Sequence, residues 1–291
     1  MKSILNKLRN YEIEIRKTVN SQFAGDHYSV FKGQGIEFDD VRLYQYGDDV
    51  RAINWNVTAK GHGVYVKTFK EEREQFVYFI YDVSASEEIG SGNRRKKDLG
   101  NELCGVLALA AARQMSKVGL ICYSSQREKY IQPDTGEKHA VEIINSLYRL
   151  NPKQRATDLK SALIFALSMI KRKSIIFLIS DFIDEGYEKH LMALALKHDL
   201  IVIHIADKIE RELPRMGIIP VVDKETGKLR WVNTSSDRLT NNLSGQFEKI
   251  KNELSNLCHK YQADYLMVDT KDDLVDSLIH LFNKRNKSFK K

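Results

Sequence analysis

The stretch from Phe76 to Ser86, FVYFIYDVSAS, decides how this chain folds. Its first six residues are all apolar or aromatic, which is typical of a strand that is buried on both faces of a parallel sheet. The next five, Asp82-Val83-Ser84-Ala85-Ser86, place an oxygen-bearing side chain at every second position. The stretch therefore predicts a buried strand that runs into a tight loop lined with oxygen atoms.

Further apolar runs follow the first one, and stretches with helical spacing lie between them. Leu99, Leu103, Val106 and Leu107 show this spacing directly after the quoted stretch. The other strand-like runs are Ile175 to Ile179, Leu200 to Ile205 and Tyr265 to Val268, with Gly119 to Tyr123 as a weaker one. Alternation of strand and helix predicts a doubly wound, mostly parallel α/β sheet of Rossmann type with helices on both faces.

Residues 1–74 do not follow this alternation. They contain a helical opening, then a stretch rich in Gly and Asp with short alternating pieces, which predicts a small β-rich N-terminal module. The α/β domain is predicted over residues 75–283, followed by a basic tail over residues 284–291. Within the domain, residues 207–234 form an excursion with a predicted hairpin whose turn lies near Thr226 and Gly227.

Length and composition exclude several classes of protein. The 291 residues, with 42% hydrophobic and 29% charged, describe a folded globular chain rather than a disordered one. No apolar run reaches the roughly 20 residues that span a bilayer, and the first residues lack a signal peptide's apolar stretch. Three scattered cysteines favour a reducing compartment. We therefore expect a cytoplasmic protein without transmembrane segments or disulfides.

The formal net charge of +7 raises nucleic-acid binding as an alternative function. Nine cations lie in two short segments, and without them the chain is slightly acidic. They are Arg94, Arg95, Lys96 and Lys97 in the first segment and Lys284, Arg285, Lys287, Lys290 and Lys291 in the tail. A terminal basic tail is typical of a solvated end. The first segment follows Ser86 closely, so we expect it to attract an acidic partner toward that loop.

A carboxylate follows each of four apolar runs. This is the carboxyl end of the predicted strand, and open α/β sheets bind their ligands at that end. Each of them also has a simpler explanation, because Asp at a strand end often caps the next helix. They are Asp82, Asp181, Asp207 and Asp269.

Asp82 differs from the others because Ser84 and Ser86 follow it. Three oxygen ligands without His or Cys suit a hard cation such as Mg²⁺. Thr157, on a loop ahead of a helix, and Asp181, at the end of a later strand, are candidates to complete the ligand set. Thr157 taken alone is better explained as a helix cap.

Taken together, these five residues resemble the metal-ion-dependent adhesion site of von Willebrand factor A domains, whose pattern is Asp-x-Ser-x-Ser, then Thr, then Asp. An upstream segment resembles the signature of the bacterial family called domain of unknown function 58, which precedes a von Willebrand A-like domain. That segment comprises Gly33 to Phe38, Val41 to Tyr44, Gly47 to Arg51, Ile53 to Trp55 and Ala59-Lys60. Its charged residues are expected to form ion pairs that hold the module in place.

The resemblance implies a non-enzymatic protein-interaction module that binds Mg²⁺ or another divalent cation, with an acidic side chain of the partner as the last ligand. It implies an adaptor in protein assembly or maturation whose partners are MoxR-type AAA+ ATPases and other von Willebrand A-domain proteins. Many relatives carry transmembrane segments ahead of the signature. This chain begins only about 30 residues before it, so a membrane role is expected only through a partner.

An enzyme is the remaining alternative. The chain lacks a Walker motif, a GxSxG elbow and an HExxH motif. A Mg²⁺-dependent phosphohydrolase with Asp82 as nucleophile would usually carry a second carboxylate two residues later, where this chain has Ser84. Salt and Mg²⁺ distinguish nucleic-acid binding from the adhesion-site function. Nucleic-acid binding would weaken steeply with salt and would not depend on Mg²⁺, whereas binding through the adhesion site would require Mg²⁺.

Overall fold

The computed structural model describes residues 2–22, 37–61, 63–70, 74–92, 94–224 and 227–288. The chain divides into two compact units. The larger unit combines Met1–Phe31 with Phe76–Lys291, and the smaller one is Lys32–Gln75. Each unit is described separately below.

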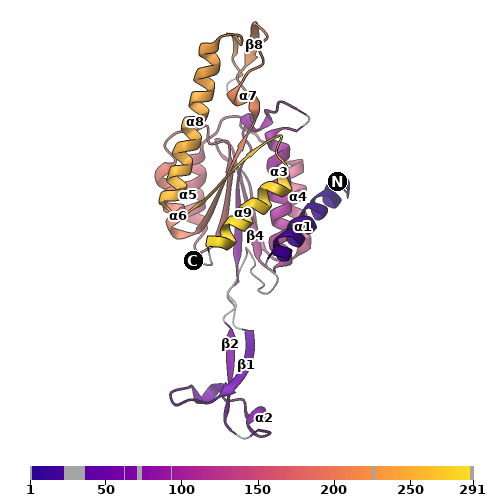
Figure 1. Cartoon of the computed structure of the whole chain (residues 1–291), viewed down its shortest axis with the longest axis vertical. Coiled ribbons are helices and arrows are strands. Elements are labelled where there is room, and N and C mark those ends of the chain that lie inside the picture. Colours follow the sequence, from indigo (N-terminus) through magenta and orange to yellow (C-terminus); the bar gives the residue numbers. More distant parts are fainter. Residues whose placement is uncertain are drawn as a thin grey trace. The chain divides into compact units, whose positions relative to one another are not determined.

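A six-stranded sheet forms the centre of the larger unit (Figure 1). In the order in which they lie side by side, its strands are β10 (Asp264–Asp269), β7 (Asp199–Ala206), β6 (Ile175–Ser180), β3 (Phe76–Asp82), β4 (Lys117–Tyr123) and β5 (Arg127–Asp134). All neighbours are parallel except β5, which pairs antiparallel with β4. The five strands expected from apolar runs and the doubly wound fold are confirmed. Strand β5 escaped prediction because its sequence, REKYIQPD, is polar and lies at a sheet edge.

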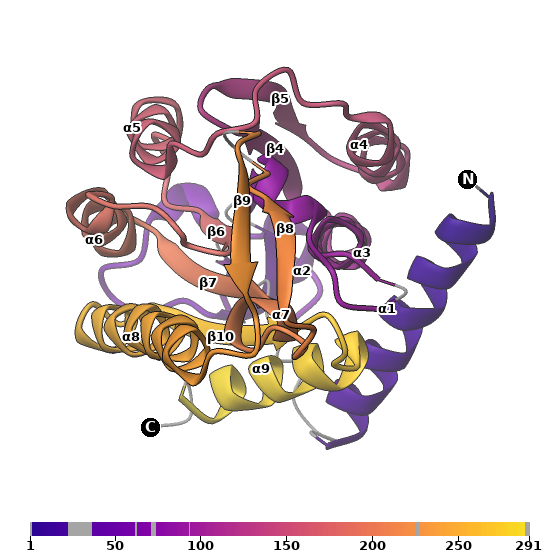
Figure 2. The ribbon, with the colours of Figure 1, turned by 90° about the horizontal axis from the view of Figure 1, so that it is seen from above.

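Helices cover both faces of the sheet, as the view from above shows (Figure 2). Strand residues therefore alternate between two cores: Val77 and Phe79 point into one, and Tyr78 and Ile80 into the other. The first core is completed by α1 (Lys2–Gln22), α3 (Lys96–Arg113), α4 (Glu137–Arg149) and α9 (Leu274–Ser288). The second is completed by α5 (Leu159–Met169), α6 (Glu188–Lys197) and α8 (Asp237–Lys260).

Helix α1 belongs to the unit of the central sheet, whereas the sequence grouped it with the rest of residues 1–74. Its buried residues Leu8 and Ile15 join the first core. A Cβ at Gly105 of α3 would lie 2.7 Å from Leu8 Cδ1, so this glycine permits the close approach of the two helices. The amphipathic pattern of α1 did not show which unit would cover its apolar face.

The smaller unit contains the antiparallel strands β1 (Glu37–Leu43) and β2 (Tyr65–Lys70), with the short helices η1 (Val50–Ala52) and α2 (Trp55–Thr58). The β-rich character expected near the N-terminus is thus confirmed. Within this unit, the two terminal nitrogens of the Arg42 guanidinium donate to Asp48, at 2.8 and 2.6 Å. That such pairs hold the module to the sheet domain stays a prediction. The signature residues Gly33 to Ile36 lie outside the described residues.

The predicted hairpin in the excursion is confirmed as β8 (Ile218–Val222) and β9 (Leu229–Asn233). It follows the short helix α7 (Lys208–Arg211) and lies beyond the carboxyl ends of the sheet strands (Figures 1 and 2). Thr234 is buried at its base and donates its backbone N–H to Gly217 O at 2.8 Å.

The basic tail requires a correction. Helix α9 continues to Ser288, and Arg285 is only 2% exposed within it. Its guanidinium forms ion pairs with Asp264 and, at 2.6 Å, with Asp199. A charge count along the sequence could not reveal this, because both carboxylates belong to distant strands. The side chains of Lys287, Lys290 and Lys291 lie outside the described residues.

We expect Arg285→Ala to lower the free energy of unfolding by about 3 kcal/mol, because it leaves Asp199 and Asp264 without their shared cation. The neighbouring variant Lys284→Ala changes an exposed side chain and should stay within about 0.5 kcal/mol of the wild type. Urea denaturation followed by circular dichroism measures both. Equal midpoints for the two variants would show that Arg285 behaves as the solvated tail residue first expected.

Candidate metal centre

The predicted site lies at the point where the strand order of the sheet reverses. From β3 the chain continues to β4 and β5 on one side, then returns to β6 on the other. Strands β3 and β6 are parallel neighbours, and Tyr81 lies opposite Ile179. Asp82 and Asp181 therefore leave the sheet at the same edge, which is where open α/β sheets place their ligands.

The loop after β3 brings Asp82, Ser84 and Ser86 together as predicted. Asp82 accepts hydrogen bonds from the backbone N–H of Ser84 and from the hydroxyl of Ser180, both at 2.9 Å. The hydroxyls of Ser84 and Ser86 lie 3.0 Å apart. Residues Ala85–Glu88 form a short 3₁₀ helix, η2. This turn keeps the hydroxyls of Ser84 and Ser86 on the same side of the loop.

Lys96 is the first unexpected member of this site. It was predicted to lie on an exposed partner-binding segment, but its side chain is 0% exposed. Its ammonium donates to Asp181 Oδ2 at 2.7 Å and to Glu210 Oε1 at 2.5 Å. Lys96 begins α3 and Glu210 belongs to α7, so one buried cation connects two helices to the end of β6.

The other three cations of that segment also have partners within the chain. Arg94 forms an ion pair with Glu102, and Arg95 pairs with Asp98 at 3.1 Å. Lys97 donates to the carbonyl of Leu150 at 3.5 Å. The segment thus attaches the start of α3 to its surroundings, and Lys96 is not available to a partner.

Glu87 is the second unexpected member, and it comes directly after the serines of the loop. Its side chain is 0% exposed, and neither carboxylate oxygen has a hydrogen-bond partner in the part of the chain that the structure describes. One carboxylate oxygen each of Asp82, Glu87 and Asp181 lies within 4.8 Å of the other two. The sequence feature that could have identified Glu87 as a member of the site is its position directly after Ser86.

Burial and neighbouring charges shift the pKa values of the three clustered carboxyl groups. Burial, and then the negative charge of Asp181, raise the pKa of Asp82 to about 7. Burial also raises the pKa of Glu87 well above its ordinary value. Burial acts in the same direction on Asp181, but the charge of Lys96 and the hydrogen bonds from Lys96, Ser86 and the backbone of Ile183 together hold the pKa of Asp181 below its ordinary value. Asp82 and Glu87 therefore hold their protons more tightly than ordinary carboxyl groups, whereas Asp181 is held ionised.

Thr157 lies on the loop between α4 and α5. Its loop contacts the serine loop, because the N–H of Ala85 donates to Arg155 O at 2.9 Å. The capping role considered for Thr157 falls instead to Asp158, which accepts from the N–H of Ser161 at 2.8 Å and begins α5.

The residues fit a hard divalent cation. The carboxyl groups of Asp82, Glu87 and Asp181 are buried together, and the ammonium of Lys96 contacts one of them, Asp181. Carboxylate and hydroxyl oxygens are the ligands that Mg²⁺ and Mn²⁺ prefer. The oxygens of Glu87 have no hydrogen-bond partner among the described residues, so they are available to a cation. Asp82, Asp181 and the two serines would hold the cation.

The remaining strand-end carboxylates have structural roles. Asp207 caps α7, accepting from the N–H of Ile209 at 2.9 Å, as the simpler explanation predicted. It also accepts from the N–H of Ser91 at 3.0 Å, which attaches the loop before α3 to α7. Asp269 forms an ion pair with Arg211.

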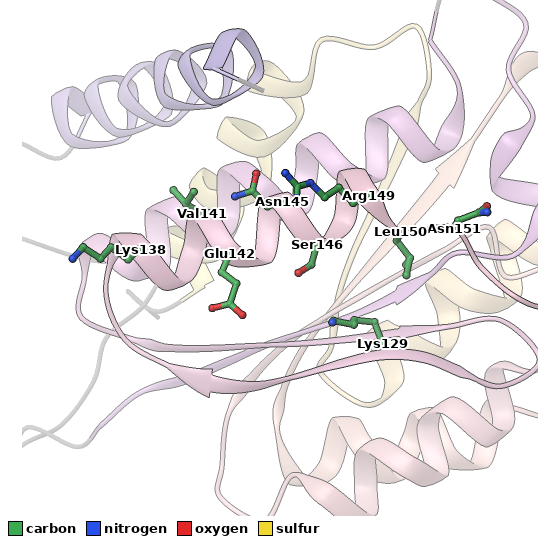
Figure 3. A pocket seen from close by; sticks show the side chains of 9 residues that line it. All are labelled: Lys129, Lys138, Val141, Glu142, Asn145, Ser146, Arg149, Leu150 and Asn151. Atoms are coloured by element: carbon green, nitrogen blue, oxygen red, sulfur yellow. The ribbon is translucent and has the colours of Figure 1, made fainter.

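A groove of about 550 Å³ lies away from this cluster, between α4 and β5 (Figure 3). Lys129 of β5 lies on one side of it, and Lys138, Glu142 and Arg149 of α4 belong to the other. None of its lining residues belongs to the predicted metal site.

Comparison with known proteins places the chain among relatives of unknown function. The family model described as protein of unknown function DUF58 matches residues 40–252. An uncharacterized protein of Mycobacterium tuberculosis is 26% identical over 228 residues, which are 77% of this chain and 71% of that protein.

Two solved structures from Bacteroides are similar at a lower level. The conserved hypothetical protein BatB from Bacteroides thetaiotaomicron matches with a TM-score of 0.47 and 15% identity. An aerotolerance-related membrane protein from Bacteroides fragilis matches with a TM-score of 0.46 and 17% identity. Each match covers 73% of this chain and 99% of the other.

Among the described helices of this chain, none is both long and apolar enough to cross a bilayer.

Proposed function

This chain belongs to the DUF58 family, and on that premise we propose that it is a non-enzymatic, divalent-cation-dependent protein-interaction module. Its cation is Mg²⁺ or a similar ion held, directly or through water, by Asp82, Ser84, Ser86, Thr157 and Asp181. Its partner is a MoxR-type AAA+ ATPase, as the family resemblance implies, and it acts as a cytoplasmic adaptor in protein assembly or maturation.

One observation carries this proposal: a buried carboxylate cluster and an exposed apolar face lie at the same edge of one sheet. Lys96 contacts the carboxylate of Asp181, whereas the oxygens of Glu87 have no hydrogen-bond partner among the described residues. The apolar face belongs to the β8–β9 hairpin, whose preceding helix α7 supplies Glu210 to Lys96. A partner that docks on this edge therefore meets a cation site and a hydrophobic surface together.

The hairpin face is unusually apolar for an exposed surface. Cross-strand pairs Pro220–Trp231 and Val222–Leu229 share one side of the hairpin. Trp231 is 69% exposed and Leu229 58% exposed, and Ile218 lies on the same side. Contiguous exposed apolar side chains of this kind mark interaction sites, and Trp is enriched at the energetic centres of protein interfaces.

The hairpin's charges favour a protein partner over a membrane. Asp223 and Lys224 are exposed at its tip, so insertion of the tip into lipid would bury both charges at a high cost. Arg230 is exposed on the opposite side of the hairpin, where it pairs across the strands with Val221. An apolar partner surface that also carries an acidic residue would complement both the hairpin and the cation site.

The basic segments give little support to nucleic-acid binding. Lys96 and Arg285, which lie in the two clusters of positive charge, are buried in ion pairs. Salt dependence separates the two functions, because phosphate binding weakens steeply with salt.

The direct test is binding of the purified ATPase from the same organism to the full chain, in Mg²⁺ and in chelator, at two salt concentrations. We expect binding in Mg²⁺ and its loss in chelator or in Asp82→Asn, with the fold unchanged by circular dichroism. Binding that is insensitive to both chelator and Asp82→Asn would refute the metal-dependent function.

We also expect Leu229→Ser combined with Trp231→Ser to weaken ATPase binding about tenfold or more, because it removes the apolar centre of the docking face. The matched control is Leu196→Ser, which changes an equally exposed leucine on α6. Biolayer interferometry with immobilised ATPase measures the affinities. If the control and the hairpin variant lose affinity equally, the hairpin is not the docking face.

A further inference from the structure

We propose that Glu87 is a cation ligand supplied by this chain itself and that it occupies the position an acidic residue of the partner would take. The inference deepens the proposed function and rests on it. It concerns a residue that the adhesion-site pattern does not contain, because that pattern passes from the second serine to the later Thr and Asp.

The position of Glu87 suits a cation ligand. The residue lies in η2, between Ser86 and the exposed Glu88, and its carboxylate is directed into the chain. It is fully buried, and one of its oxygens lies within 4.8 Å of one oxygen each of Asp82 and Asp181. The neighbouring Glu88 shows that the turn also offers a solvent-exposed position for a glutamate.

Burial without a partner is costly for a carboxylate. A buried acceptor that lacks a hydrogen bond costs about 1–3 kcal/mol, and more when it is charged. The ammonium of Lys96 does not meet this need by contact, because its hydrogen bonds go to Asp181 and Glu210. A divalent cation among the three carboxylates would supply the missing charge, as metal ions do in other clusters of this kind.

The same arrangement leaves no open position for an external carboxylate. Asp82 and Glu87 are 0% exposed, and Asp181 and Ser86 are also buried. A partner's acidic side chain can therefore reach the cation only if one of the chain's own carboxylates leaves. Glu87 is the one to leave, because Asp82 and Asp181 are held by hydrogen bonds from Ser180 and Lys96. Glu87 would thus stabilise the cation in the free chain and compete with the partner.

The first experiment uses the metal alone. Mn²⁺ binding to the full chain is measured by electron paramagnetic resonance for the wild type, Glu87→Gln and the matched control Glu88→Gln. We expect Glu87→Gln to bind Mn²⁺ about tenfold more weakly or worse and the control to bind as the wild type does. If Glu87→Gln binds Mn²⁺ as tightly as the control, Glu87 is a neutral buried acid and not a ligand.

The second experiment tests competition, with the ATPase as probe and Mg²⁺ at a concentration that saturates each variant. We expect Glu87→Gln to bind the ATPase several-fold more tightly than the wild type, because the competing ligand is gone. Equal or weaker binding would overturn the competitive role.

The outcomes separate this inference from the proposed function. Wild-type chain that binds no Mn²⁺ refutes the metal centre, and the role of Glu87 falls with it. Wild-type chain that binds Mn²⁺ and the ATPase, with Glu87→Gln unchanged in both assays, refutes only the role of Glu87.

Discussion

Replacing Lys96 with methionine is expected to lower the free energy of unfolding by about 3–5 kcal/mol in the absence of divalent cations. Methionine preserves most of the side-chain volume, so the loss reflects charge and not a cavity. The variant leaves Asp181 and Glu210 without the ammonium that both contact. Breaking a buried ion pair by removing one member is costly because the remaining charges stay buried.

Urea denaturation in chelator measures this loss, with Lys97→Met as the control in the same turn of α3. A second measurement keeps the test informative if the variant is only partly folded in chelator. Mn²⁺ should stabilise Lys96→Met more than it stabilises the wild type, because the ion replaces the missing positive charge. A loss no larger than that of Lys97→Met would show that Lys96 does not compensate the cluster.

The second large effect expected is a stabilisation of the wild type by Mg²⁺ or Mn²⁺ that depends on pH. At a concentration one hundred times the dissociation constant, a bound cation adds about 2.7 kcal/mol to the free energy of unfolding. This gain should appear at pH 8 and shrink at pH 5.5, because Asp82, with a pKa of about 7, is protonated at the lower pH. Metal ligands must be deprotonated to bind.

Without a cation the pH dependence has the opposite sign. The pKa of Asp82 is raised in the folded chain from an ordinary value of 3.8. Its contribution to stability is therefore fully present below about pH 4 and is lost as the pH rises through 7. Thermal unfolding in chelator should show this decline, and divalent cations should reverse it.

The control for both pH experiments is Asp82→Asn, whose side chain does not titrate in this range. It should lose the cation effect and much of the decline between pH 5.5 and 8. If Mg²⁺ and Mn²⁺ leave the melting temperature of the wild type unchanged at pH 8, the carboxylate cluster is not a divalent-cation site.

Part of the candidate site could be predicted because its signals are local. Asp82, Ser84 and Ser86 lie within five residues directly after a buried strand, and a strand-to-helix loop brings alternate side chains together. Asp181 was predictable for a related reason, since parallel strands end at one edge of the sheet. Lys96 and Glu210 could not be predicted, because they meet only when α3 and α7 pack at that edge.

The amino-acid sequence by itself determined the doubly wound sheet, its parallel strands and the serine loop, because burial on both faces requires long apolar runs with a polar residue at each end. Only the tertiary structure decided where the positive charge lies. Lys96 and Arg285 belong to basic runs that are typical of solvated surfaces, yet each lies among carboxylates from distant segments. The physical reason is that the energy of a charge depends on its neighbours in space and on its distance from water, which a linear count of residues does not contain.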